Sequence, residues 1–209
     1  MGSKEAGSLI IKSMFVFEEV FREYLDSVGP AVYSEISALI EKPAQHEKWT
    51  GSFDLWEEDE VWFAPLEWAE DGTKEDFKAY YCLDYINDGK VLDEYLYHIS
   101  PILGITATQA GFSFALERKY IGNPKVGDLK KFCQNHRNYD SLIGIGFRQT
   151  SNGKLFIPFK VDATALADAY ANDTIVDALQ PIADALEKLR NAHPLFAELV
   201  ADAERSFLK

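Results

Sequence analysis

The sequence predicts an α+β protein in which a mainly antiparallel sheet, with a mixed sheet as the alternative, lies between N-terminal and C-terminal helices. Apolar residues recur at helical spacing over about 9–42 and about 163–208, whereas short apolar runs and turn signals fill about 50–161. No linker, low-complexity tract or internal repeat divides the 209 residues. We therefore expect one α+β domain over 1–209.

The N-terminal part predicts two helices. One apolar face over 9–28 is formed at helical spacing by Phe17, Val20, Phe21, Tyr24, Leu25 and Val28. Gly29-Pro30 predicts the end of this helix, because Gly suits the position after a helix and Pro suits the first turn of the next one. The second helix is expected over about 31–41, and Pro43 is expected to close it.

The middle of the chain predicts strands. Segments 52–56 and 61–68 flank an acidic turn and predict a hairpin, and 77–86 predicts a third strand. Segment 91–99 fits a helix or a strand, and the helix is preferred. A short helix is expected at 126–135. Further strands are expected at 102–108 and 112–120 around Gln109-Ala110-Gly111, and at 142–149 and 154–161 around the turn Ser151-Asn152-Gly153.

The C-terminal part predicts helices again. Asp162 is expected to cap a helical stretch that is kinked or restarted at Pro181, and Pro194 is expected to open a final helix. One apolar stripe joins Ile175, Leu179, Ile182, Leu186 and Leu189. At this spacing the stripe predicts the helix face that covers the sheet, with a homodimer seam as the alternative.

Composition narrows the class of protein. The chain has 14 Phe, 10 Tyr and 4 Trp, far more apolar surface than a disordered chain carries. No apolar run approaches the ~20 residues that cross a bilayer, so no membrane partner is expected. Cys82 and Cys133 are too few for a disulfide scaffold, and the four His are scattered. Two free thiols predict a reducing, cytoplasmic location.

Charge is distributed unevenly along the chain, whose net charge is −13. Residues 51–100 carry 14 acids against 3 bases, whereas residues 101–160 carry 3 acids against 9 bases. Acidic turns and solvated strands explain part of this pattern. The two halves can also pack side by side and neutralise each other.

The acidic hairpin is also a candidate recognition surface, because all four Trp lie in or beside it. Trp at the rim of a charged patch is a common interface anchor, although we expect at least half of these Trp in the sheet core. The candidate partner-binding residues are Trp56, Glu57, Glu58, Asp59, Glu60 and Trp62. They predict a non-enzymatic inhibitor, immunity or accessory protein that binds a basic protein partner and needs no cofactor.

The basic segment, residues 101–160, suggests a negatively charged partner such as a nucleic acid. Cations interleaved with aromatic residues suit a phosphate backbone and unstacked bases. The candidate nucleic-acid contacts are Arg118, Lys130, Lys131, Arg137 and Arg148. The structural alternative for Lys130 and Lys131 is the solvated face of a short helix.

Glu117-Arg118-Lys119 is the most suggestive short motif. On a strand, Glu117 and Lys119 would project to the same side, where Glu117 can hold a divalent metal and Lys119 can stabilise developing charge. The order strand, E-x-K, helix, strand resembles that of restriction-endonuclease-like nucleases over about a quarter of the chain. The resemblance implies a metal-dependent nuclease, or an inactive relative, with Glu117 and Lys119 as catalytic residues. The family's acid before the E-x-K strand is missing from 102–108.

Overall fold

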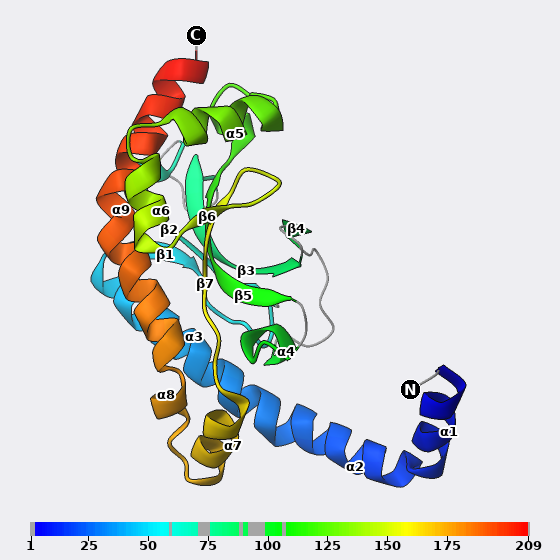
Figure 1. Cartoon of the computed structure of the whole chain (residues 1–209). Coiled ribbons are helices and arrows are strands. Elements are labelled where there is room, and N and C mark those ends of the chain that lie inside the picture. Colours follow the sequence, from blue (N-terminus) through cyan, green and yellow to red (C-terminus); the bar gives the residue numbers. More distant parts are fainter. Residues whose placement is uncertain are drawn as a thin grey trace.

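The computed structural model describes residues 3–58, 60–70, 76–87, 90–91, 99–105 and 108–208. The expected α+β class is confirmed: an antiparallel sheet lies between helices from both ends of the chain (Figure 1). Within the described ranges, no helix combines the length and the apolar character that crossing a bilayer requires.

The N-terminal helices form one long path instead of two separated helices. They are α1 (Ser3–Lys12), α2 (Met14–Glu23), the π-helical turn η1 (Tyr24–Val28) and α3 (Gly29–His46). The expected stop at Gly29-Pro30 is wrong, because Gly29 keeps a helical φ of −59° and Pro30 lies in the first turn of α3. A Cβ at Gly29 would lie 2.5 Å from the Trp56 ring, so this glycine makes room for Trp56. Pro43 likewise lies inside α3 instead of closing it.

The sheet is antiparallel at every described pairing. Its order is β1-β2-β3-β5-β7-β6, and β4 pairs with the end of β3. The strands are β1 (Trp49–Ser52), β2 (Trp62–Pro65), β3 (Ala79–Asn87), β4 (Lys90–Val91), β5 (Gln109–Leu116), β6 (Arg148–Gln149) and β7 (Leu155–Pro158).

The first hairpin and the strand at 77–86 are confirmed, although β1 lies earlier than the predicted 52–56. The strand expected at 102–108 is wrong, because α4 (Ile99–Ile102) and a turn occupy its beginning. The preferred helix at 91–99 falls mostly outside the described residues. Gly111 lies within β5 instead of a turn: a Cβ there would lie 2.3 Å from the Ile157 carbonyl oxygen, so the glycine permits a close approach of β7.

The strand expected at 142–149 is mostly a helix. After α5 (Val126–Asn135), which matches its prediction, α6 (Tyr139–Ile145) ends at Gly146 with a left-handed φ of +118°. A short apolar run such as Leu142–Phe147 fits a helix as well as a strand, and the glycine supplies the helix stop. Only β6 remains of the predicted strand, and it pairs with β7.

The C-terminal helices are α7 (Ala163–Ala171), α8 (Ile175–Ala178) and α9 (Gln180–Phe207). Asp162 caps α7 as expected, since its Oδ1 accepts a 2.8 Å hydrogen bond from the Ala165 amide. Pro194 does not open a helix but lies inside α9, whose buried residues continue past it.

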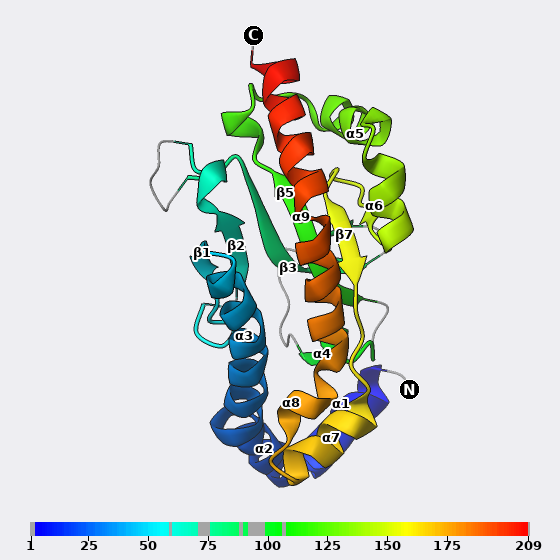
Figure 2. The ribbon, with the colours of Figure 1, turned by 90° about the vertical axis from the view of Figure 1, so that its left-hand side faces the viewer.

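Helices α9 and α3 cover the same face of the sheet, and α9 crosses it lengthwise (Figure 2). Phe196 of α9 stacks on Phe114 of β5, with ring centroids 4.4 Å apart, and meets Tyr81 of β3 edge-on. Because strand side chains alternate, Tyr80, Cys82 and Asp84 of β3 lie on the opposite face of the sheet. The covered face is therefore the core, and the opposite face carries polar groups.

His193 of α9 is enclosed in this core. Its Nδ1 is hydrogen-bonded to the Tyr81 hydroxyl at 2.9 Å, and its ring contacts Trp49 and Trp68. Burial lowers the pKa of His193 from its ordinary 6.5 and outweighs the opposing effect of Glu67 and Glu47. The folded protein therefore favours neutral His193.

The pH dependence of stability follows from this burial. Unfolded His193 binds a proton near pH 6.5, whereas folded His193 binds it only at lower pH, so the unfolded chain holds more protons between the two pKa values. We expect the free energy of unfolding to be full above pH 6.5 and to fall as the pH drops through that value. Urea unfolding at several pH values in this window measures the free energy of unfolding as a function of pH. This free energy should change less with pH in His193→Gln than in the wild type. An equal pH dependence in both proteins would contradict the assignment.

Candidate functional site

The acidic loop, residues 53–61, joins β1 to β2, and hydrogen bonds fix its first part, residues 54–57. Asp54 Oδ1 accepts hydrogen bonds from the amides of Trp56, at 3.1 Å, and Glu57, at 2.9 Å. The Leu55 amide donates to Ser37 Oγ of α3 at 3.2 Å, and the Leu55 side chain is buried. The loop is thus fixed against α3, with the side chains of Glu57, Glu58 and Glu60 exposed.

Trp56 forms one wall beside this loop. Its ring stacks on Tyr33 of α3 at 5.5 Å and meets the edge of Tyr24 at 6.3 Å. A cleft of about 630 Å³, here called the α3 cleft, opens between the loop and α3. It is lined by Pro30, Ser34, Ser37, Glu41, Gly51, Ser52, Phe53, Asp54, Trp56, Glu57 and Glu58. Four of these residues are acids and none is a base, so the cleft is negatively charged.

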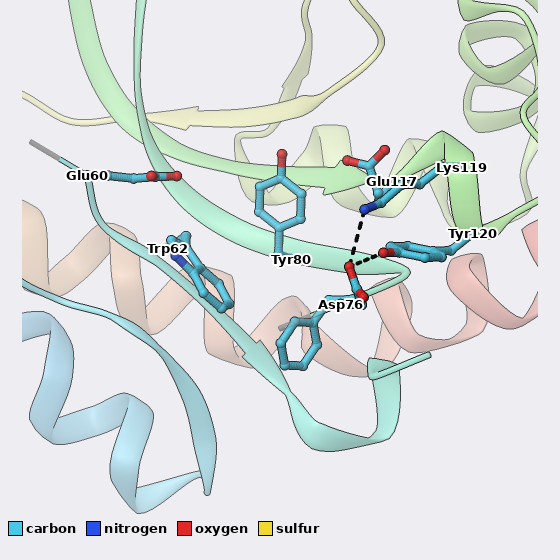
Figure 3. A pocket seen from close by; sticks show the side chains of 8 residues that line it. Glu60, Trp62, Asp76, Tyr80, Glu117, Lys119 and Tyr120 are labelled. Carbon is cyan, nitrogen blue, oxygen red and sulfur yellow. Dashed lines mark hydrogen bonds and ion pairs between the residues drawn. The ribbon is translucent and has the colours of Figure 1, made fainter. Parts of the chain in front are cut away.

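A second hollow, here called the Tyr80 pocket, lies where the loop returns into β2. It measures about 190 Å³ and is lined by Glu60, Trp62, Asp76, Phe77, Tyr80, Glu117, Lys119 and Tyr120. Figure 3 shows Tyr80 between Glu60 and Trp62 on one side and Glu117 on the other. The fold therefore brings residues predicted for two different functions into one pocket.

Ordinary packing holds the aromatic walls of the Tyr80 pocket. Trp62 is half-buried, and its ring lies 5.6 Å from that of Phe77. Burial raises the pKa of Tyr80 to about 12, so its hydroxyl is neutral at physiological pH. A neutral phenol beside an indole presents polarisable ring faces without charge, a surface that suits a cation.

Lys119 is occupied by its own neighbours. Its Nζ lies 3.2 Å from Asp76 Oδ1 and 4.3 Å from the centre of the Tyr120 ring, and Tyr120 also donates a hydrogen bond to Asp76 (Figure 3). Tyr120 and then Lys119 lower the pKa of the Asp76 carboxyl by hydrogen bonding to it. The charge of Lys119 is thus balanced within the pocket, whereas that of Glu117 has no bonded cation in the described structure.

Other acids within residues 51–100 form ion pairs. Asp84 binds Lys154 at 2.8 Å, Glu70 lies 3.7 Å from Lys78, and Asp76 binds Lys119. The acidic loop differs, since none of Glu57, Glu58 and Glu60 forms an ion pair with a described residue. Glu58 accepts a hydrogen bond from Ser52 Oγ, which leaves its charge uncompensated. Within the described part of 51–100, the unneutralised negative charge is therefore concentrated on this loop, while Asp59 lies outside the described residues.

The candidate nucleic-acid residues lie on several elements, and Arg137 alone among the five forms an ion pair with a described residue. Arg137 of the α5–α6 connection binds Glu198 of α9 at 3.0 Å. Arg118 Nε donates to the Pro124 carbonyl at 2.6 Å. Lys130 and Lys131 lie on α5, as the solvated-face interpretation expects, and Arg148 lies over the ring of Phe156 on β6 and β7. The ion pair with α9 neutralises Arg137, while the other four residues keep their charges on a 3₁₀ turn, α5 and β6.

The geometry of Glu117 and Lys119 differs from the expected motif. Glu117 follows β5 and precedes a 3₁₀ turn, Arg118–Tyr120, so Glu117 and Lys119 do not alternate along one strand. The strand expected after the short helix is α6. Across the part of the chain that the structure describes, no three His, Cys, Asp or Glu side chains gather closely enough to share a metal ion.

Sequence reasoning missed the polar face of β3. Lys154 Nζ lies 2.8 Å from Asp84 Oδ2 and 3.6 Å from Cys82 Sγ, next to Tyr80 on the same face. Burial, followed by the Asp84 carboxylate, raises the pKa of the Cys82 thiol, so the thiolate needed for nucleophilic attack does not form. The alternation of Tyr80, Cys82 and Asp84 was the signal available in the sequence. The pairing of Asp84 with Lys154 could not be predicted, because it depends on the order of β3, β5 and β7 in the sheet.

Two of the four Trp belong to the core, as expected for at least half of them. Trp49 is 7% exposed and Trp68 is 3% exposed, whereas Trp56 and Trp62 remain half-buried beside the acidic loop.

No family model, curated protein or solved structure matches this chain. The loop and its two hollows are therefore the features from which a function is inferred.

The metal hypothesis has a direct test. Because no cluster of three potential ligands surrounds Glu117 among the described residues, we expect Mg²⁺ and Mn²⁺ to leave the melting temperature at its value in EDTA. Differential scanning fluorimetry of the wild type and Glu117→Gln measures this. A metal-dependent rise in the wild type that disappears in Glu117→Gln would instead support the nuclease-like site.

Proposed function

We propose that the chain is a non-enzymatic cytosolic binding protein, of the inhibitor, immunity or accessory type, whose acidic loop binds a basic partner protein. The observation that carries this proposal is the unpaired charge of Glu57, Glu58 and Glu60 between two hollows, on a loop whose first part, residues 54–57, is fixed by hydrogen bonds. A segment fixed in this way loses little conformational entropy on binding, so more of the interaction free energy appears as affinity.

The Tyr80 pocket provides a place for one cationic side chain of the partner. Trp62 and Tyr80 offer aromatic faces, and Glu60 and Glu117 supply carboxylates at its two sides (Figure 3). A Lys or Arg side chain over such rings gains ~0.5–2 kcal/mol, depending on desolvation. The pocket volume of about 190 Å³ suits one such side chain better than a folded segment.

The α3 cleft extends the same surface. Glu41 and Asp54 add their carboxylates to those of Glu57 and Glu58, and Trp56 supplies an apolar wall. A basic segment that crosses the loop would therefore meet negative charge on both sides. Such complementarity raises the association rate and makes it fall with ionic strength. The two buried free cysteines, Cys82 and Cys133, agree with a reducing cytosol.

Charge reversal on the loop tests the proposal. We expect Glu57→Lys, Glu58→Lys and Glu60→Lys together to reduce capture of the partner from cell extract by about tenfold or more, because repulsion replaces attraction. Wild-type capture should also fall steeply as salt increases. Quantitative mass spectrometry of the proteins retained by the immobilised chain measures both effects.

A matched control carries the same change in net charge elsewhere. Asp168, Asp177 and Glu187 are exposed on α7, α8 and α9, so their replacement by Lys should leave capture unchanged. Equal losses in the two triple variants would show that only the net charge matters. Capture that survives both the loop reversal and high salt would exclude the acidic loop as the binding site.

A further inference from the structure

The N-terminal arm, residues 3–28, exposes an unusual amount of apolar surface. Ten of the sixteen large apolar side chains exposed in the described structure lie between residues 9 and 25. Among them, Ile11 is 74% exposed, Phe15 is 71% exposed and Val20 is 64% exposed. α2 buries no residue, and the arm extends away from the sheet (Figure 1).

The area of this surface is too large for an ordinary monomer. At ~150–250 Å² for an aromatic side chain and less for an aliphatic one, the ten partly exposed residues present on the order of 1,000 Å² of mainly apolar surface, distributed around α1, α2 and η1. The largest apolar patch on a typical monomer measures ~300–600 Å². A standard protein interface buries ~800 Å² on each partner. The arm therefore has the area that one side of a stable dimer requires.

The charges of the arm argue against a lipid surface. Helices that lie on membranes usually carry Lys and Arg on the polar side, which attract anionic headgroups. This arm carries five acids and three bases, and Glu18, Glu19 and Glu23 are exposed on α2. An anionic bilayer would repel these carboxylates. A protein surface is thus the better match.

The arm is complementary to a second copy of itself. Glu18 and Arg22 lie one helical turn apart on the same edge of the apolar face, and neither forms an ion pair within the described chain. Consider two arms that pair antiparallel around a two-fold axis level with Val20. Each edge of the apolar face then lies beside the same edge of the partner's face. Each Glu18 then lies beside the partner's Arg22, and on the other edge the two Val20 side chains meet each other.

We propose that the chain forms a homodimer through antiparallel pairing of its N-terminal arms, with the apolar residues of α2 in the seam. Interhelical Glu–Arg pairs at the edge set the register, as charges at the edges of coiled coils do. The core residues stay outside this seam, because no described side chain of α1 or α2 belongs to the hydrophobic core. The dimer is independent of the acidic loop.

Sedimentation velocity of the full chain tests the proposal. We expect a species of twice the 23.6 kDa chain mass at protein concentrations of ~1–100 μM. Val20→Glu would place two carboxylates together at the axis and should raise the dimer Kd by about tenfold or more. Val176→Glu changes a valine that is 50% exposed on α8 and should leave the Kd unchanged.

Charge exchange tests the register. Glu18→Arg should weaken the dimer, and adding Arg22→Glu should restore it, because the double variant re-forms the pair with opposite signs. A wild type that stays monomeric over the whole concentration range overturns the proposal. A dimer indifferent to Val20→Glu does so as well, since another face would then form it. Monomers that sediment with phosphatidylserine vesicles would assign the arm to a lipid surface instead.

Discussion

The packing of α9 across one face of the sheet is the contact on which the rest of the structure depends. Phe196 lies at its centre, against Phe114, Tyr81 and Phe147. Burial of one such side chain contributes ~1.5–3 kcal/mol, and α9 buries a continuous stripe of them. Because α9 occupies this face, alternate residues of β3 must lie on the other one. That geometric constraint places Tyr80 and Asp84 where a pocket and a buried ion pair can form.

The same packing also decides which charges remain free. The carboxylates of α9 reach Arg137 and Lys78, so the cations nearest to that helix are neutralised. The acidic loop lies at the other end of the sheet order, beside α3, where the described structure supplies no cation to it. Separation of charge along the sequence thus survives folding on the acidic loop. On the basic side, Lys119, Arg137 and Lys154 are paired, whereas the other bases of 101–160 form no ion pair with a described residue. The proposed binding surface rests on the unpaired acids of the loop.

Local signals predicted that both ends are helical, because apolar residues recur there at helical spacing, and turn residues predicted the first hairpin. The boundary signals at Gly29-Pro30, Pro43 and Pro194 were wrong, because each of these prolines continues a helix. Local signals also failed where one signal served two structures: the apolar run of α6 also fits a strand, and Gly111 marks close packing as readily as a turn. The acidic loop was visible in the sequence. The Tyr80 pocket was not, because Glu60 and Glu117 meet only through the order of β2, β3 and β5.

The four tryptophans provide the most direct measurement of where a basic ligand binds. A lysine-rich peptide, added at low salt, should shift the indole N–H NMR signals of Trp56 and Trp62, which line the two hollows beside the acidic loop. The signals of Trp49 and Trp68, buried under α9, should stay in place. Four unmoved signals, or shifts confined to the two core residues, would contradict the proposed binding surface.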